Sequence, residues 1–181
     1  MSPLPVELGE GLLIRRYTMD DLDAIWSAVE ENRERLGVWM PWIEHNRTVE
    51  DQREWLKGVV ADQTNLDGTG IWTGDDYAGG IGIRVWPFTI GAEMGYWIRA
   101  VYEGRGFVTR AADAMLGIAF GEIGVHRVTI RAGVENVRSR AIPERLGFSY
   151  EGIERGGGKG TGGFYDLAVY GLLEDEWRSR E

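Results

Sequence analysis

The feature that most constrains this chain is a Gly-Arg-Gly turn, Gly104–Gly106, between a strand-like segment and a helix-like one. Residues 93–100 are rich in aromatic and aliphatic side chains, and apolar residues recur at helical spacing after residue 106. The first N–H groups of a helix have no internal partner, and glycines let the backbone approach an anion closely. The turn therefore predicts a diphosphate site to which Arg105 or Arg110 adds a charged contact. A plain strand-to-helix turn is the alternative.

Two better-known phosphate motifs do not fit this turn. The sequence lacks G-x-x-x-x-G-K-[ST], which argues against a P-loop nucleotidase, and its turn is not the G-x-G-x-x-G of dinucleotide-binding folds.

Hydrophobic periodicity predicts a mixed α/β (α+β) fold in one domain, residues 1–181, with about seven strands and helices on both faces of the sheet. The expected order is strand, two helices, three strands, helix, strand, helix, two strands. We expect strands at 11–17, 70–74, 78–86, 91–101, 125–134, 148–154 and 164–173, and helices within 18–37, 48–62, 106–124 and 137–148. Thr18, Asp20 and Thr48 are candidate helix caps.

Charge and composition exclude several classes of function. The net charge of −9 argues against a nucleic-acid grip built on phosphate neutralisation, and it suits a cationic amine substrate. The chain has no cysteine and only two histidines, His45 and His126, so we expect no metal site. No segment resembles a membrane span or a signal peptide, so we expect a cytoplasmic protein.

A second motif follows about 30 residues after the turn, in "ENVRSRAIPERLGF". It is similar to N-x-x-S-x-x-(V/A)-x-E-(K/R)-L-G-F, and "YEGRGFV" is similar to the phosphate loop Q/R-x-x-G-x-G/A, with Glu103 and Val108 as departures at its ends. Matching residues of the second motif are Asn136, Ser139, Glu144, Arg145, Leu146, Gly147 and Phe148. Both motifs resemble those of the GNAT superfamily of N-acetyltransferases. "VWMPWIEHNRTVEDQREWL" and "AEMGYWI" resemble its RimJ/RimL-type branch, which acetylates protein N-termini and some small amines.

The resemblance implies a mostly antiparallel sheet with a splayed parallel strand pair where acetyl-CoA binds. It implies backbone contacts with the pantetheine from the strand at 96–98, where we single out Trp97 and Ile98, and a contact from Asn136. It also implies a diphosphate site at Gly104, Arg105, Gly106, Phe107, Val108 and Thr109. It implies transfer of the acetyl group directly to an amine, without a metal, in a monomer or a homodimer.

Two residues are candidates for the catalytic proton transfers. Glu93, near the start of the strand that reaches the reacting centre, is our candidate general base, since a partly buried carboxylate can take the proton of an amine. A surface glutamate on a strand is the alternative. Ser139 is the candidate partner of the leaving thiol, and an ordinary first-turn serine is the alternative. The alternative candidates for these proton transfers are Glu154, Asp166, Glu44 and Tyr165.

The acceptor side is less defined. Trp39, Met40 and Trp42 are interpreted as core residues rather than as an aromatic lid, and Glu44 and His45 are the polar residues beside them. Residues 155–163 carry six glycines, which predicts either a loop that orders on substrate binding or a disordered connection. Ribosomal-protein enzymes of the resembled branch carry a glutamate near the position of Gly158. Its absence keeps open a catalytically weak acyl-CoA-binding module, and an unrelated phosphate-ligand enzyme is a third hypothesis.

Overall fold

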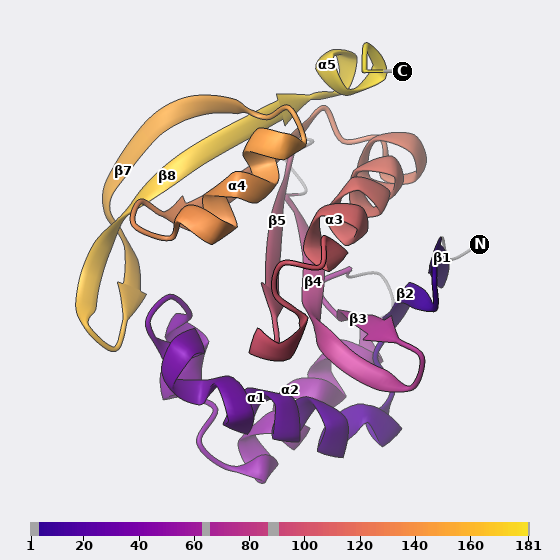
Figure 1. Ribbon diagram of the computed structural model, residues 1–181, viewed down its shortest axis with the longest axis vertical. Coiled ribbons are helices and arrows are strands. Elements are labelled where there is room, and N and C mark those ends of the chain that lie inside the picture. Colours follow the sequence, from indigo (N-terminus) through magenta and orange to yellow (C-terminus); the bar gives the residue numbers. More distant parts are fainter. Residues whose placement is uncertain (1–3, 63–65, 87–90, 181) are drawn as a thin grey trace.

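The protein is built around one eight-stranded sheet. A computed structural model describes residues 4–62, 66–86 and 91–180. The strand order is β1-β2-β3-β4-β5-β6-β8-β7, and each pair is antiparallel except β5 with β6 (Figure 1). The strands are β1 Val6–Gly9, β2 Leu12–Arg16, β3 Thr69–Thr73, β4 Asp76–Trp86, β5 Gly91–Ile98, β6 Arg127–Gly133, β7 Ser149–Gly160 and β8 Gly163–Leu173. The predicted mixed sheet is confirmed, with β1 as the strand beyond the expected seven.

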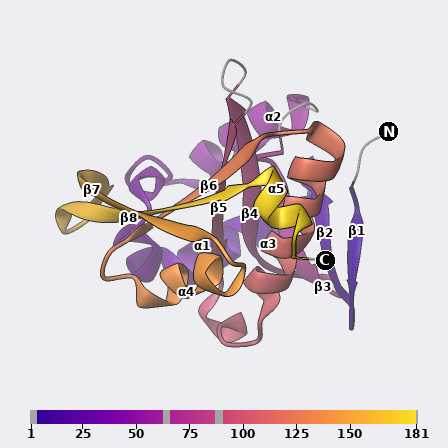
Figure 2. The ribbon, with the colours of Figure 1, turned by 90° about the horizontal axis from the view of Figure 1, so that it is seen from above.

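Helices cover both faces of this sheet, as predicted. On one face lie α1 Leu22–Gly37 and α2 Val49–Ala61, and on the other lie α3 Phe107–Gly117 and α4 Val137–Arg145 (Figure 2). Neighbouring residues of β3 show the alternation: Ile71 belongs to the core under α3, and Trp72 belongs to the core under α1 and α2. The remaining elements are η1 Met19–Asp21, η2 Pro41–Glu44, η3 Ala100–Tyr102, the π-turn η4 Ile118–Ile123 and α5 Glu174–Arg178.

Helix α2 begins at the predicted cap. The backbone N–H of Asp51 donates to Thr48 Oγ1 at 3.2 Å, and the Asp51 carboxylate accepts from the Thr48 N–H at 2.8 Å. This reciprocal pair satisfies two N–H groups that would otherwise lack partners. It fixes where the chain leaves the irregular segment 38–47.

Strands β5 and β6 separate after a short parallel stretch. They pair only from Gly91–Glu93 with Arg127–Thr129. Beyond this point β5 remains paired with β4 up to Ile98, and β6 remains paired with β8 up to Gly133. The sheet therefore contains a gap between the second halves of β5 and β6, which is the splayed pair implied by the resemblance.

The glycine-rich segment 155–163 forms the end of a β-hairpin, so its prediction as a loop or a disordered connection is wrong. It continues β7, turns at residues 161–162 and enters β8. The hairpin tip rests on the end of α1, where Thr161 N–H donates to the Gly37 carbonyl at 2.9 Å. A Cβ on Gly160 would lie 2.0 Å from the Val38 carbonyl oxygen, so glycine is required there for close packing rather than for flexibility.

Within the described part of the chain, no helix is long and apolar enough to cross a membrane.

Candidate active site

The Gly-Arg-Gly turn has the geometry of an anion cradle. Gly104 and Gly106 have φ angles of 73° and 74°, and Gly106 is the N-cap of α3. The Arg110 N–H donates to the Gly106 carbonyl at 3.0 Å, which closes the first helical turn. Among the described residues, no acceptor meets the backbone N–H groups of residues 104–109. No heavy atom lies within 4 Å of a Cβ built on either glycine, so the space beside the turn is open, as a bound diphosphate requires.

The charges around the turn explain the departure at Glu103. This carboxylate pairs with Arg35 of α1 at 2.6 Å and with Arg138 of α4. Two guanidinium groups thus offset its negative charge and tie the turn to both helices. Arg35 also donates to the Ile98 carbonyl, so the same contacts hold the end of β5.

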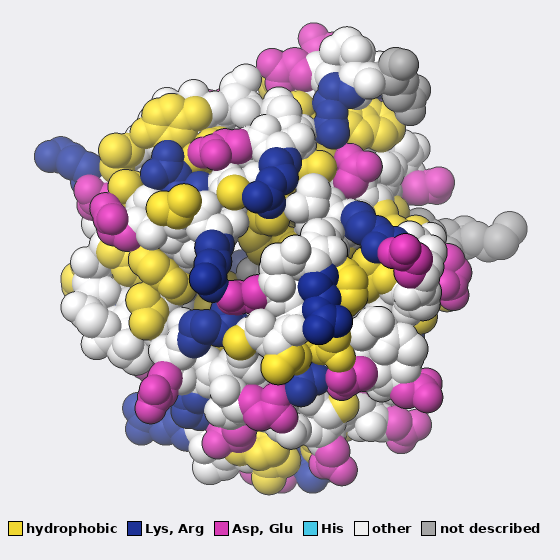
Figure 3. Space-filling view, viewed as in Figure 1, with side chains coloured by type: hydrophobic (Ala, Val, Ile, Leu, Met, Phe, Trp, Pro, Cys, Tyr) yellow, Lys and Arg dark blue, Asp and Glu magenta, His cyan; other side chains and the backbone are white. Residues whose placement is uncertain are grey.

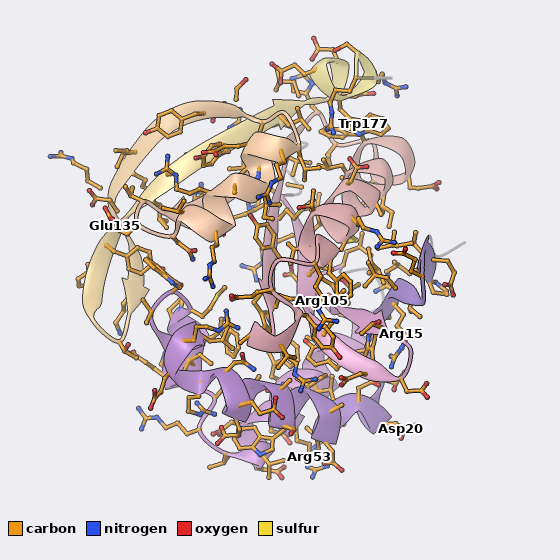
Figure 4. The ribbon with its side chains drawn as sticks, in the orientation of Figure 1. Arg15, Asp20, Arg53, Arg105, Glu135 and Trp177 are labelled. Carbon is orange, nitrogen blue, oxygen red and sulfur yellow. The ribbon has the colours of Figure 1, made fainter. Side chains whose placement is uncertain are left out.

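The two arginines proposed for the diphosphate differ in position. Arg105 lies in the turn just before α3, with its guanidinium 5.3 Å from the Tyr102 ring centroid (Figure 4). Arg110 turns away onto β1, where it contacts Glu10 and the carbonyls of Leu8 and Gly9. Basic side chains gather in the middle of the face that carries α3 and α4, and acidic side chains are frequent over α1 and α2 (Figure 3). Of the two, Arg105 is therefore the one available to an anion at the turn.

The amides of β5 alternate between its two neighbours. Arg99 N–H donates to the Ala78 carbonyl on the β4 side, so the odd-numbered residues of β5, Trp97 included, direct their amides to β4. The amides of Tyr96 and Ile98 consequently face the gap. Two residues were expected to offer backbone contacts. The amide of Ile98 faces the gap, whereas the amide of Trp97 faces β4 and its side chain packs on the face of α1 and α2.

The start of α4 lies across the gap from β5. Asn136 caps the helix, since its Oδ1 accepts from the Ser139 N–H at 3.2 Å. The Tyr96 hydroxyl donates to the Ser139 carbonyl at 2.9 Å, and burial raises the pKa of Tyr96 despite this hydrogen bond. Tyr96 thereby joins β5 to α4, with the half-buried Ser139 beside the gap.

A cavity of about 940 Å³ meets this gap. Its lining comes from both faces of the sheet. Asn136 and Ser139 represent the α4 side, and the α1/α2 side contributes an aromatic wall and several polar groups. That wall comprises Tyr17, Trp39, Trp42, Trp55, Tyr77 and Trp97. Two reactants can therefore approach the gap from different sides.

Glu93 lies in this cavity but is not isolated. Its Oε2 accepts from Arg131 Nη1 at 2.7 Å, and Arg131 Nε donates to Glu154 at 3.1 Å. The Glu93 and Arg131 side chains are 35% and 30% exposed. The arginine orients one carboxylate oxygen of Glu93, and the other oxygen has no hydrogen-bond partner among the described residues. Glu154, one of the alternative candidate bases, belongs to the same cluster.

The other candidate bases are engaged or lie elsewhere. The Tyr165 hydroxyl donates to the Trp39 carbonyl at 2.6 Å, and burial raises its pKa. Hydrogen bonding from Lys159 lowers the pKa of Glu44. Asp166 is exposed and accepts from the Gly156 N–H at 2.7 Å. Neither Glu44 nor Asp166 lines the cavity.

The aromatic segment is half-buried rather than fully in the core. Met40 and Trp42 pack against the core under α1 and α2, and both also line the cavity. The ring centroids of Trp42 and Trp97 lie 6.4 Å apart, and those of Trp39 and Tyr165 lie 5.2 Å apart in an edge-on arrangement. The segment therefore acts as a wall that serves both packing and the site. The described residues contain no cluster of three or more His, Asp or Glu that could hold a metal.

Three residues of the site carried no signal in the sequence. Arg131, Arg138 and Arg35 act through partners 38, 35 and 68 positions away. Such pairs depend on strand register and helix placement, which local patterns do not encode. The only available hint was the acidic residue at Glu103, where a compensating cation could be sought.

Comparison with known proteins agrees with this geometry. The profile of the family described as "Acetyltransferase (GNAT) domain" matches residues 11–149. The chain is 32% identical to the putative ribosomal N-acetyltransferase YdaF of Bacillus subtilis (strain 168), over 97% of this chain and 98% of that protein. A solved "Probable acetyltransferase" shares 32% identity, with a TM-score of 0.87 and coverage of 96% and 99%. A solved RimL ribosomal L7/L12 alpha-N-protein acetyltransferase in complex with coenzyme A has the same fold, with 20% identity, a TM-score of 0.89 and coverage of 96% and 99%.

Proposed function

The chain belongs to the GNAT acetyltransferase family, and on that premise we propose that it transfers the acetyl group of acetyl-CoA directly to a primary amine. The observation that carries the proposal is the gap between β5 and β6, which lies between a turn with unpartnered amides and a large polar-aromatic cavity. The name of the YdaF relative, a putative ribosomal N-acetyltransferase, supports a ribosomal amine as the acceptor.

The turn fits the diphosphate of acetyl-CoA, the carrier of the acetyl group. Amides of residues 104–109 have no acceptor among the described residues, and no side chain fills the space above Gly104 or Gly106. Arg105 supplies a cation beside the turn, and the ion pair with Glu103 holds Arg138 near it. The Ile98 and Tyr96 amides then offer strand-like hydrogen bonds to the pantetheine arm.

The thioester supplies an acetyl carbon that a neutral amine can attack, and the side chains manage the protons. Glu93 accepts the proton of the amine, directly or through water. A backbone N–H of β5 stabilises the negative charge that develops on the thioester oxygen. As the N–C bond forms, the C–S bond breaks and its electron pair leaves with the sulfur. The Ser139 hydroxyl donates a hydrogen bond to this thiolate, which takes up its proton from solvent.

Two measurements test the proposal. Calorimetry with pure protein should detect acetyl-CoA binding, and a thiol-release assay with a panel of amines and N-terminal peptides should detect transfer. Glu93→Gln should reduce kcat by about 10²-fold or more and change its pH dependence, with the affinity for acetyl-CoA retained. Glu122→Gln is the control, because Glu122 is exposed and lies outside the cavity lining.

The outcomes separate the hypotheses. Absence of any acetyl-CoA binding would contradict the whole assignment. Binding without thiol release for any amine would favour the acyl-CoA-binding module. An unchanged pH profile in Glu93→Gln would remove Glu93 from the mechanism while leaving the transfer reaction intact.

A further inference from the structure

We propose that Gly95 determines the acceptor specificity. Its missing side chain leaves the opening beside the reacting centre for an amine whose nitrogen-bearing carbon carries a substituent. The inference rests on the proposed function and concerns which amines can reach the same centre.

Several glycines line the cavity, and at all but one of them protein atoms already occupy the space that a Cβ would need. A Cβ on Gly80 would lie 2.7 Å from the Trp97 ring nitrogen, and one on Gly82 would lie 2.7 Å from the Asp67 backbone. A Cβ on Gly133 would meet the Trp39 ring at 2.5 Å, and one on Gly158 would meet the Tyr165 ring at 2.1 Å. These glycines are explained by packing, because each makes room for a neighbouring ring or chain segment.

Gly95 has no such explanation. Of the cavity-lining glycines in the described part of the chain, it alone has no heavy atom within 4 Å of a built Cβ. Its φ angle is not positive, so its backbone conformation does not require glycine. It is exposed although β5 lies in the middle of the sheet between β4 and β6. In a strand that lines a cavity, a glycine that neither the backbone nor the packing requires leaves room for a ligand to approach closely.

The direction of the missing side chain identifies that ligand as the acceptor. Side chains alternate along a strand, so Gly95 shares its face with Glu93 and Trp97, which is the face of α1 and α2. A carrier that pairs with β5 as an added strand lies in the plane of the sheet. A group that occupies the space above Gly95 comes instead from the cavity, on the side of the candidate base.

The open space beside Gly95 indicates the class of amine. The cavity opens directly onto Gly95, with Glu93 before it and the Trp97 ring after it on the same face. A straight-chain amine has only a CH₂ group next to its nitrogen and makes no use of that space. An amine with a branch on that carbon, such as the first residue of a peptide with a side chain, places the branch over Gly95.

The test compares wild type with Gly95→Ala on short peptides that differ only in their first residue: glycine, alanine, serine or leucine. We expect kcat/KM for the alanine-first, serine-first and leucine-first peptides to fall by about ten-fold or more, since one methyl group in a fitted pocket has an effect of that order. The glycine-first peptide should change little. The Kd for acetyl-CoA and the melting temperature should match wild type. Gly58→Ala is the control, because Gly58 also has open space around its Cβ but does not line the cavity.

Other results would overturn the inference. Equal losses for all four peptides, no loss for any of them, or weaker binding of acetyl-CoA by Gly95→Ala would each show that Gly95 does not select the acceptor. These results leave the proposed function intact as long as wild type releases thiol. A wild type that binds acetyl-CoA but acetylates no amine would overturn the proposed function, and this inference with it.

Discussion

The turn at Gly104–Gly106 and the hairpin segment 155–163 are both rich in glycine, yet they use it in opposite ways. Around Gly104 and Gly106 a side chain would meet nothing within 4 Å. In the hairpin, a Cβ on Gly158 or Gly160 would lie 2.1 Å from the Tyr165 ring or 2.0 Å from the Val38 carbonyl. The two glycines of the turn leave open space, whereas Gly158 and Gly160 of the hairpin bring protein surfaces together. Glycine content alone does not distinguish the two, so substitutions should.

The largest effect on stability is expected from Gly160→Ala. The added methyl group meets a backbone carbonyl that cannot rotate away, so we expect the free energy of unfolding to fall by about 3 kcal/mol, as for other overpacked sites. Turnover should also fall, because the hairpin carries Gly158 and Tyr165 of the cavity wall. Urea denaturation measures the first effect and thiol release the second. An unchanged midpoint would contradict the packing role.

Gly106→Ala should affect stability less and ligand binding more. An alanine at φ 74° costs about 1–2 kcal/mol of unfolding free energy. Its methyl group also occupies the space in front of the unpartnered amides, so the Kd for acetyl-CoA should rise by about ten-fold. Calorimetry measures this change. An unaltered Kd would show that the diphosphate does not lie at the turn.

Gly156→Ala is the matched control in the hairpin. Gly156 has a φ of 63° and no heavy atom within 4 Å of a built Cβ, which are the properties of Gly106. We expect the same strain of about 1–2 kcal/mol and no change in the Kd for acetyl-CoA. A rise in Kd equal to that of Gly106→Ala would mean that strain, rather than position, explains both results.

Gly162→Ala should have the smallest effect. Gly162 lies at the hairpin turn, has no positive φ, and has open space around it. Its substitution should change the unfolding free energy by less than about 0.5 kcal/mol, as at other unconstrained surface positions. A larger loss, seen in the same urea series, would reveal a contact of the turn that the geometry does not indicate.

Much of the fold could be predicted because its signals are local. Helix α2 follows from the Thr48 cap and its apolar spacing, and α3 follows from a glycine turn ahead of a periodic run. Strand β1 was missed because Val6–Gly9 is too short to show alternation. The hairpin glycines were misinterpreted because the atoms that require them, on Val38 and Tyr165, come from other segments.

The site was predictable only in outline, for the same reason. Glycine at 104 and 106 and the motif at Asn136 mark the place where we propose that acetyl-CoA binds. The partner of Glu93 is Arg131, and that pairing depends on the parallel register of β5 and β6. The amide of Ile98 faces the gap and the amide of Trp97 faces β4, and both directions likewise follow from the pairing of β5 with β4. Strand register, rather than residue type, decides these features.

The position of the cavity wall along the chain has a consequence for synthesis. Residues leave the ribosome from the N-terminus onward, so the cradle at Gly104–Gly106 and the helix at Asn136 emerge before Glu154, Gly158 and Tyr165. A nascent chain therefore contains the Gly104–Gly106 turn and the start of α4 before it contains the hairpin side of the cavity.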